Sequence, residues 1–188
     1  MSESRGGLDQ TLRLWDAKTG AARQVWPDHK GAICALAFSP DGRRLASAGE
    51  TRTVYVWDVA GGHITHTFPG HTSRLWALAF SPDGRLLASG GDDQIIRLWD
   101  VAGGKLLRTL PGHTNRVWAI RFSPTGSTFV SGSADGAIKV WDIDTGACLH
   151  TWRSEEPYAG LNITGATGLT AAQKTTLQTL GAKVSVSN

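Results

Sequence analysis

The sequence predicts an all-β fold made of repeated four-stranded antiparallel sheets. Trp-Asp pairs recur every 42 residues, at Trp15, Trp57, Trp99 and Trp141. Within each interval, short runs rich in Val, Ile, Leu and Trp alternate with turn residues such as Gly, Asp and Pro, which is the pattern of antiparallel strands. A repeat of this length is one supersecondary unit that cannot bury its own apolar faces, so neighbouring units are expected to stack.

The repeat that begins at Gly70 contains each expected element in order. Four strands are expected at Leu75–Phe80, 86–89, 95–100 and Lys105–Leu110. The first is a continuous apolar run, which suits a strand covered on both faces. Ser-Pro-Asp-Gly at 81–84 joins the first two strands, because proline presets its own φ and glycine closes a tight hairpin turn. The same link occurs at 39–42 and, with Thr125 in place of Asp, at 123–126.

Applied along the chain, the repeat predicts five parts and about three and a half sheets. These parts are a partial sheet at 1–27 with only its outer two strands, full sheets at 28–69, 70–111 and 112–152, and a C-terminal segment at 153–188. The last segment departs from the repeat. It is expected to contain a strand at 158–164 and a helix at 171–180 that opens with a capping box at 170–173, and to cap the last sheet, since terminal repeats are atypical.

Composition and charge exclude several function classes. The net charge of +3 comes from 19 basic and 16 acidic residues that are interspersed, so no basic stripe favours nucleic acid. No run of apolar residues is long enough to cross a membrane and the N-terminus is polar, which favours a cytoplasmic protein. Cys34 and Cys148 occupy non-equivalent repeat positions, so no disulfide or zinc site is expected and both are expected to fill the core. His63 and His66 should point to opposite faces of a strand, which leaves no expected metal or cofactor.

One set of polar residues recurs at constant offsets. His71, Ser89, Asp93 and Trp99 reappear 42 residues later as His113, Ser131, Asp135 and Trp141. A Ser, a His and an Asp suggest a hydrolase triad, in which the His relays a proton between a hydroxyl and a carboxylate. A catalytic set is needed only once, however, and the sequence has no strained Gly-x-Ser-x-Gly turn. The duplication therefore favours a structural role and a protein that is not an enzyme.

Over residues 7–152 the chain resembles the WD-repeat β-propeller family, because the period, the Gly-His pair, Ser-Pro-Asp-Gly and Trp-Asp recur together. The resemblance implies a hydrogen-bond chain within each sheet, from the Trp indole to Ser, from Ser to His and from His to Asp. In the first full repeat His29, Ser47 and Trp57 keep this pattern, but Thr51 replaces the Asp and Asp28 replaces the Gly. The network of that repeat is therefore expected to be the weakest.

The resemblance also implies a docking surface, on the face that carries the Gly-His loops and the turns between second and third strands. Trp and Arg dominate binding hot spots, so Trp76 and Trp118 are the best candidates, although a simple core role is an equal alternative. The full set of candidate partner-binding residues is Glu50, Arg74, Trp76, Asp92, Arg116 and Trp118.

These observations predict a non-enzymatic scaffold that binds proteins and takes part in signalling or regulation. The resemblance suggests the C-terminal piece of a longer bacterial WD-repeat protein. The alternative is a structural module, a half-propeller that completes a ring with itself or with another subunit, because unstacked sheet faces at its ends would be apolar.

Overall fold

The computed structural model describes residues 10–27 and 29–153, the backbone of residues 2–6, and three positions in the C-terminal segment. The chain forms two compact units, at 1–152 and 153–188. In the second unit, the described positions are Thr170, Gln173 and Thr175, the last two with helical backbone. The Thr170 and Gln173 side chains each accept a hydrogen bond from the other's backbone N–H, at 3.2 and 2.9 Å, as a capping box does. The expected strand at 158–164 and most of the helix at 171–180 lie outside the described residues.

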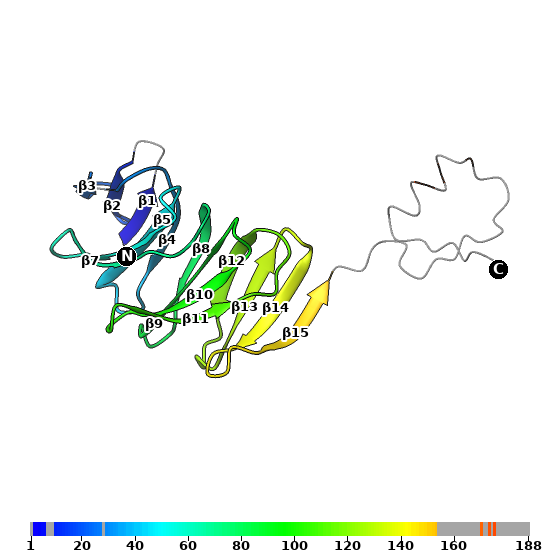
Figure 1. The fold of residues 1–188 in the computed structure, drawn as a ribbon. Coiled ribbons are helices and arrows are strands. Elements are labelled where there is room, and N and C mark those ends of the chain that lie inside the picture. The colour runs from blue at the N-terminus through cyan, green and yellow to red at the C-terminus, as the bar shows by residue number, and fades with distance from the viewer. Residues whose placement is uncertain are drawn as a thin grey trace, which may run out of the picture. The chain divides into compact units, whose positions relative to one another are not determined.

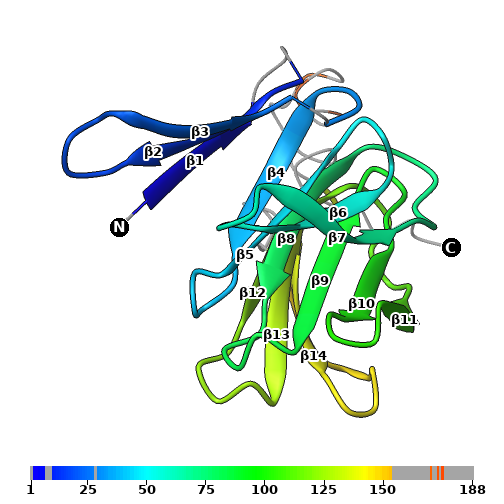
Figure 2. The same ribbon diagram turned by 90° about the vertical axis from the view of Figure 1, so that its left-hand side faces the viewer.

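The described residues of the first unit form fifteen strands in four antiparallel sheets, and within each sheet the strands are in chain order. Figure 1 shows the sheets following one another from the blue N-terminal strands to the yellow β15, and Figure 2 shows the first sheet and β4 from the side. The first sheet consists of β1 (Ser2–Gly6), β2 (Leu12–Asp16) and β3 (Ala22–Trp26), and the second of β4 (Ile33–Phe38), β5 (Arg44–Gly49), β6 (Val54–Asp58) and β7 (His63–Phe68). The third consists of β8 (Leu75–Phe80), β9 (Leu86–Gly91), β10 (Ile96–Asp100) and β11 (Lys105–Leu110), and the fourth of β12 (Val117–Phe122), β13 (Thr128–Ser133), β14 (Ala137–Asp142) and β15 (Cys148–Arg153).

The all-β prediction and the partial propeller are thus confirmed, but the first sheet differs from the prediction of two strands. A third strand, β1, pairs with β2 from Ser2 opposite Asp16 to Gly6 opposite Leu12. The sequence of β1 is Ser-Glu-Ser-Arg-Gly, which has no apolar alternation. Its position is fixed by backbone pairing to β2, and that pairing leaves no signal in residue type.

The core lies between consecutive sheets, and the same repeat positions build it each time. Trp26 of β3 stacks on Trp57 of the next sheet at 5.7 Å between ring centroids. One repeat later, Phe68 stacks on Trp99 at 5.0 Å, and Leu110 joins the apolar cluster that contains Trp141. Because each indole is almost fully buried by the preceding sheet, burial of these rings contributes a few kcal/mol per interface.

The two cysteines depart from the expected core role. Cys34 is partly buried and Cys148 is exposed, and both are free. Cys148 lies at the start of β15, where every side chain of the strand is exposed, so no neighbouring sheet buries its thiol.

Candidate functional site

The repeated polar residues form uninterrupted hydrogen-bond chains, from Trp to Asp, in the third and fourth sheets. In the third sheet, Trp99 Nε1 donates to Ser89 Oγ at 2.8 Å, and His71 contacts Ser89 Oγ through Nε2 at 2.7 Å. The other ring nitrogen, Nδ1, lies 2.8 Å from Asp93 Oδ2. The fourth sheet repeats this geometry at 2.8, 2.7 and 2.9 Å with Trp141, Ser131, His113 and Asp135. In both sheets the His and Asp side chains are almost completely buried.

Burial and charge define the ionisation of this network. Burial lowers the pKa of His71, and the hydrogen bond to Asp93 only partly offsets it. Burial alone would raise the pKa of Asp93, but the hydrogen bonds that its carboxylate accepts from His71, the Thr72 N–H and Arg97 outweigh burial and hold this pKa at about 2. The neutral imidazole is therefore held by an ionised carboxylate through one nitrogen. Its second nitrogen is bonded to a serine that also accepts a hydrogen bond from an indole. This arrangement links the loop to the strands and has a structural role.

Arg97 extends the third-sheet network in a way that the sequence pattern does not indicate. Its guanidinium Nη1 lies 2.9 Å from Asp93 Oδ2 and 2.8 Å from His71 Nδ1. The equivalent positions in the other two full sheets hold Tyr55 and Lys139, and Lys139 instead donates to Thr151 at 2.9 Å. Because this position varies between repeats, the periodicity gives no signal for it.

The second sheet corrects the prediction for His29. Trp57 Nε1 donates to Ser47 Oγ at 2.8 Å as expected, but His29 does not join this pair. Its Nδ1 lies 3.0 Å from the carbonyl oxygen of Gly31, and its Nε2 is buried without a hydrogen-bond partner. The physical reason is Thr51, which offers no carboxylate to hold the ring, so the imidazole instead lies edge-on against Tyr55 at 5.2 Å.

Local irregularities in the innermost strands position the candidate partner-binding residues. The pairing of β4 with β5, of β8 with β9 and of β12 with β13 shifts register around Cys34, Trp76 and Trp118, respectively. A bulge inserts an unpaired residue and redirects its side chain. Trp118 is therefore 47% exposed, and Trp76 is partly exposed with neither indole in an apolar core cluster. This exposure does not fit the alternative of a simple core role for Trp118, whereas Trp76 is partly buried.

Trp76 and Trp118 belong to a group of side chains in mutual contact, the Trp–Arg stripe, which we define as Glu50, Arg74, Trp76, Asp92, Arg116 and Trp118. The Trp76 and Trp118 rings lie 5.4 Å apart and are tilted by 53°. The guanidinium carbons of Arg74 and Arg116 lie 5.4 and 5.0 Å from the centres of the Trp76 and Trp118 rings, respectively. These six residues are the candidates for partner binding predicted from the sequence, and the structure places them in contact with one another.

Acidic side chains from neighbouring turns orient the stripe. Glu50 pairs with Arg74 of the following sheet, and Asp92 accepts a hydrogen bond from Trp76 Nε1 at 2.8 Å and lies 3.4 Å from Arg116 Nε. Half-exposed ion pairs add little to stability. Their effect here is to hold each guanidinium over an indole and to link one sheet to the next.

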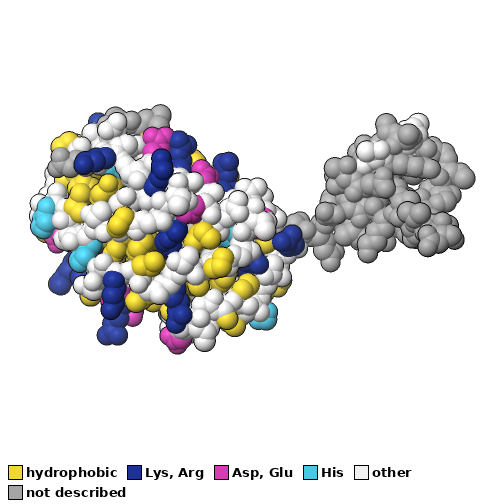
Figure 3. Space-filling view, in the orientation of Figure 1, with side chains coloured by type: hydrophobic (Ala, Val, Ile, Leu, Met, Phe, Trp, Pro, Cys, Tyr) yellow, Lys and Arg dark blue, Asp and Glu magenta, His cyan; other side chains and the backbone are white. Residues whose placement is uncertain are grey.

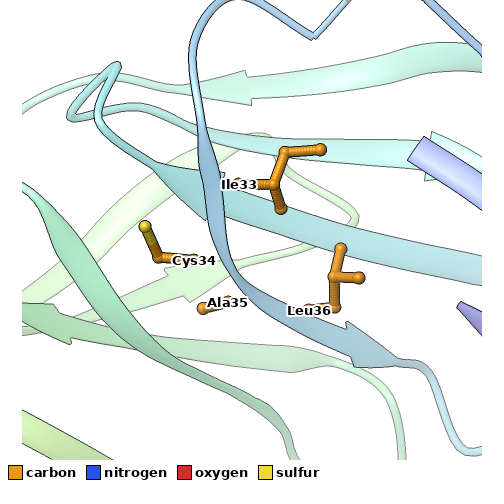
Figure 4. A pocket seen from close by; sticks show the side chains of 4 residues that line it. All are labelled: Ile33, Cys34, Ala35 and Leu36. Atoms are coloured by element: carbon orange, nitrogen blue, oxygen red, sulfur yellow. The ribbon is translucent and has the colours of Figure 1, made fainter. Parts of the chain in front are cut away.

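A shallow pocket runs beside the stripe along the three innermost strands. Its lining residues from the first of these strands include Cys34 and Leu36, and those from the other two include both stripe tryptophans and Ile120. Figure 4 shows the β4 end of this region, where Ile33 and Cys34 point to opposite sides of the strand. Burial raises the pKa of the Cys34 thiol, so this cysteine is a poor nucleophile that serves as pocket wall.

Within the described residues, no group of three or more His, Cys, Asp or Glu side chains is placed to hold a metal ion. Nor does any helix in the described part of the chain have the length and apolar character to cross a membrane.

The sheets are stacked, two of them contain a buried Trp-Ser-His-Asp chain, and aromatic side chains are exposed at the innermost strands. These features define a class of repeat proteins that bind partners. The family model for the WD domain, G-beta repeat, matches residues 20–58, 62–100 and 104–142, which is more than half of the chain. The chain belongs to this family.

Curated relatives match only short segments. The chain is 47% identical over 47 residues to eukaryotic translation initiation factor 3 subunit I of Aspergillus fumigatus, and to the same subunit of Coccidioides immitis. That segment is 25% of this chain and 14% of each relative. Coronin-7 of Mus musculus is 49% identical over 39 residues, 21% of this chain and 4% of that protein. The matched segments thus span a small part of these relatives.

Proposed function

We propose that this protein is a non-enzymatic scaffold whose Trp–Arg stripe binds a protein partner. Membership of the WD family supports the general function of protein binding. The observation that carries the assignment of the stripe is the exposure of Trp118, which a strand bulge turns out of the core beside Trp76. Exposed Trp and Arg side chains that are already oriented lose little conformational freedom on binding, and these residue types dominate hot spots.

The chemistry of the stripe defines what a partner has to supply. The tilted indoles and the pocket beside them suit an apolar or aromatic anchor, since aromatic pairs prefer such inclined geometries. Arg74 and Arg116 are each held through one side of the guanidinium, by Glu50 and Asp92, and their remaining N–H groups suit carboxylates or backbone carbonyls of the partner. A peptide segment that combines an aromatic side chain with an acidic one fits both features.

A catalytic role has no support at this site. The His, Ser and Asp side chains that resemble a triad are buried and saturated by each other and by an indole, in two copies. We further propose that the protein acts in the cytoplasm and in a signalling or regulatory assembly, as the WD repeats of other proteins do.

Selection of peptides from a random displayed library tests this proposal. The chain 1–188 and its Trp118→Ala variant serve as parallel baits, with Leu107→Ala as the matched control because Leu107 is equally exposed on an outer strand. We expect an enriched peptide motif with wild type and the control, and a loss of binding of at least about tenfold with Trp118→Ala. Equal binding of the selected peptides to all three proteins would refute the assignment of the stripe.

A further inference from the structure

The outer face of the fourth sheet is apolar and exposed at positions that are buried in every other full sheet. Ile138 is 52% exposed, whereas its repeat equivalents Val54 and Ile96 are 0% exposed. Trp152 is 55% exposed, whereas Phe68 is 1% exposed. Figure 3 shows hydrophobic side chains at the surface of this end of the unit, between charged ones. Exposed apolar faces of this kind mark interaction sites.

The internal interfaces show what such a face accepts. On the outermost strand of each sheet, the position of Trp26, Phe68 and Leu110 meets the Trp-Asp tryptophan of the following sheet. The position two residues earlier reaches the outer turn of that sheet. Gln24 donates to the carbonyl oxygen of Ala60 at 3.4 Å, and Arg108 donates to that of Thr145 at 3.3 Å.

His150 and Trp152 are the next members of these two series, and they have no following sheet within the described residues. Their rings stack at 5.7 Å and 16° on the outer face of β15. Leu149 directly precedes His150 and belongs to a different series, since its equivalents Thr65 and Leu107 stay exposed although a sheet follows. The exposure of Trp152 therefore reflects a missing neighbour, whereas the exposure of Leu149 does not.

The first sheet carries the complementary features and lacks a preceding sheet in the described residues. Trp15 occupies the position of Trp57 and Trp99, the indoles that receive a ring from the sheet before. Gly20 occupies the position of Gly62 and Gly146, which lie against Trp26 and Leu110, yet Gly20 has open space within 4 Å where a Cβ would be. The receiving half of the same interface is thus present on the same chain, with open space at Gly20 and with the Trp15 indole N–H buried without a hydrogen-bond partner.

We infer that the outer face of the fourth sheet docks onto the first sheet of a second copy of this chain. Trp152 of one copy then stacks on Trp15 of the second copy, and His150 reaches the turn at 17–20 of that second copy. The two faces differ, so the contact is head-to-tail and has to close into a ring or propagate. Two copies supply eight sheets, which lies within the range of closed propellers, so the expected species is a closed dimer.

Light scattering on the full chain 1–188 tests this inference. We expect the wild type to have twice the mass of one chain at micromolar concentration. Ile138→Asp places a charge in the contact and should shift the dimer to monomer, by at least about a hundredfold in dissociation constant, which corresponds to 2.7 kcal/mol. Leu149→Asp is the matched control and should remain dimeric. Because Ile138 is half-exposed in one chain, its replacement leaves the fold of that chain intact, which circular dichroism checks.

A photo-crosslinking side chain at position 152 identifies the occupant directly. Crosslinks between two chains that map to residues 10–27 support the inference. A monomeric wild type, an equal effect of Ile138→Asp and Leu149→Asp, or crosslinks within one chain to residues 154–188 would each overturn it. Binding of stripe-selected peptides is measured separately on Ile138→Asp, and its retention would separate this contact from the function proposed for the stripe.

Discussion

Replacement of Asp93 with alanine is expected to destabilise the protein far more than replacement of Thr51, its counterpart one repeat earlier. The Asp93 carboxylate is 4% exposed and bonds His71, Arg97 and the backbone N–H of Thr72. Its pKa is held at about 2 against an ordinary value of 3.8. At 1.36 kcal/mol per pH unit, this difference corresponds to about 2 kcal/mol of stability at neutral pH. Loss of the carboxylate also removes the acceptor beside His71 Nδ1, where the Arg97 guanidinium remains, and this raises the expected loss to about 2–4 kcal/mol.

Thr51 makes only one marginal hydrogen bond, from its Oγ1 to the carbonyl oxygen of Thr53 at 3.5 Å. Thr51→Ala should therefore cost below about 1 kcal/mol. Urea unfolding followed by circular dichroism measures both. With a slope of about 2 kcal/mol/M, Asp93→Ala should lower the midpoint by about 1–2 M and Thr51→Ala by less than about 0.5 M. Asp135→Ala is the positive control, since it removes the same network from the fourth sheet. Equal midpoints for the Asp93 and Thr51 variants would refute the reasoning.

Three further perturbations follow from the same network. Because the pKa of Asp93 is depressed, the stability that this carboxylate contributes is complete above pH about 4 and is lost as the pH falls through 3.8 toward 2. In acid titrations of the urea midpoint, the wild type should therefore lose stability over this window more steeply than Asp93→Asn. Parallel curves for the two proteins would count against this role of Asp93. Arg97→Met should cost about 1–2 kcal/mol through loss of its bond to Asp93, measured as a fall in Tm, and an unchanged Tm would contradict this. His71→Leu leaves the buried Asp93 charge without its ring partner and should cost about 3–5 kcal/mol of stability. His29→Leu removes a ring whose Nε2 has no partner, so it should cost far less by the same assay. Equal losses would argue against the finding that His29 lies outside the hydrogen-bond chain.

The sequence predicted the sheets because turn residues and apolar runs recur with the period of the Trp-Asp pairs. It missed β1, since a short polar strand at a sheet edge is held by backbone pairing and leaves no apolar pattern. It also assigned His29 to a network that fails without an aspartate at position 51. The periodicity describes which positions are equivalent, but whether a hydrogen bond forms depends on the partner that each repeat supplies.

At the candidate site, residue types identified Trp76 and Trp118, but their exposure could not be predicted from the apolar run of a strand. The bulges that turn them outward arise from the pairing of each innermost strand with its neighbour, which depends on tertiary geometry. The same holds for the contact of Arg97 with Asp93 and His71, since the equivalent residues in the other two full sheets, Tyr55 and Lys139, differ in chemistry.

Hydrogen exchange of the chain 1–188, with and without a peptide selected against it, tests the central claim most directly. If the Trp–Arg stripe binds the partner, protection should increase at the starts of β8 and β12 and in the turn after β9 that carries Asp92, and should not change in the outer strands β7 and β11. Protection confined to β7 and β11, with no change around Trp76 and Trp118, would contradict the account.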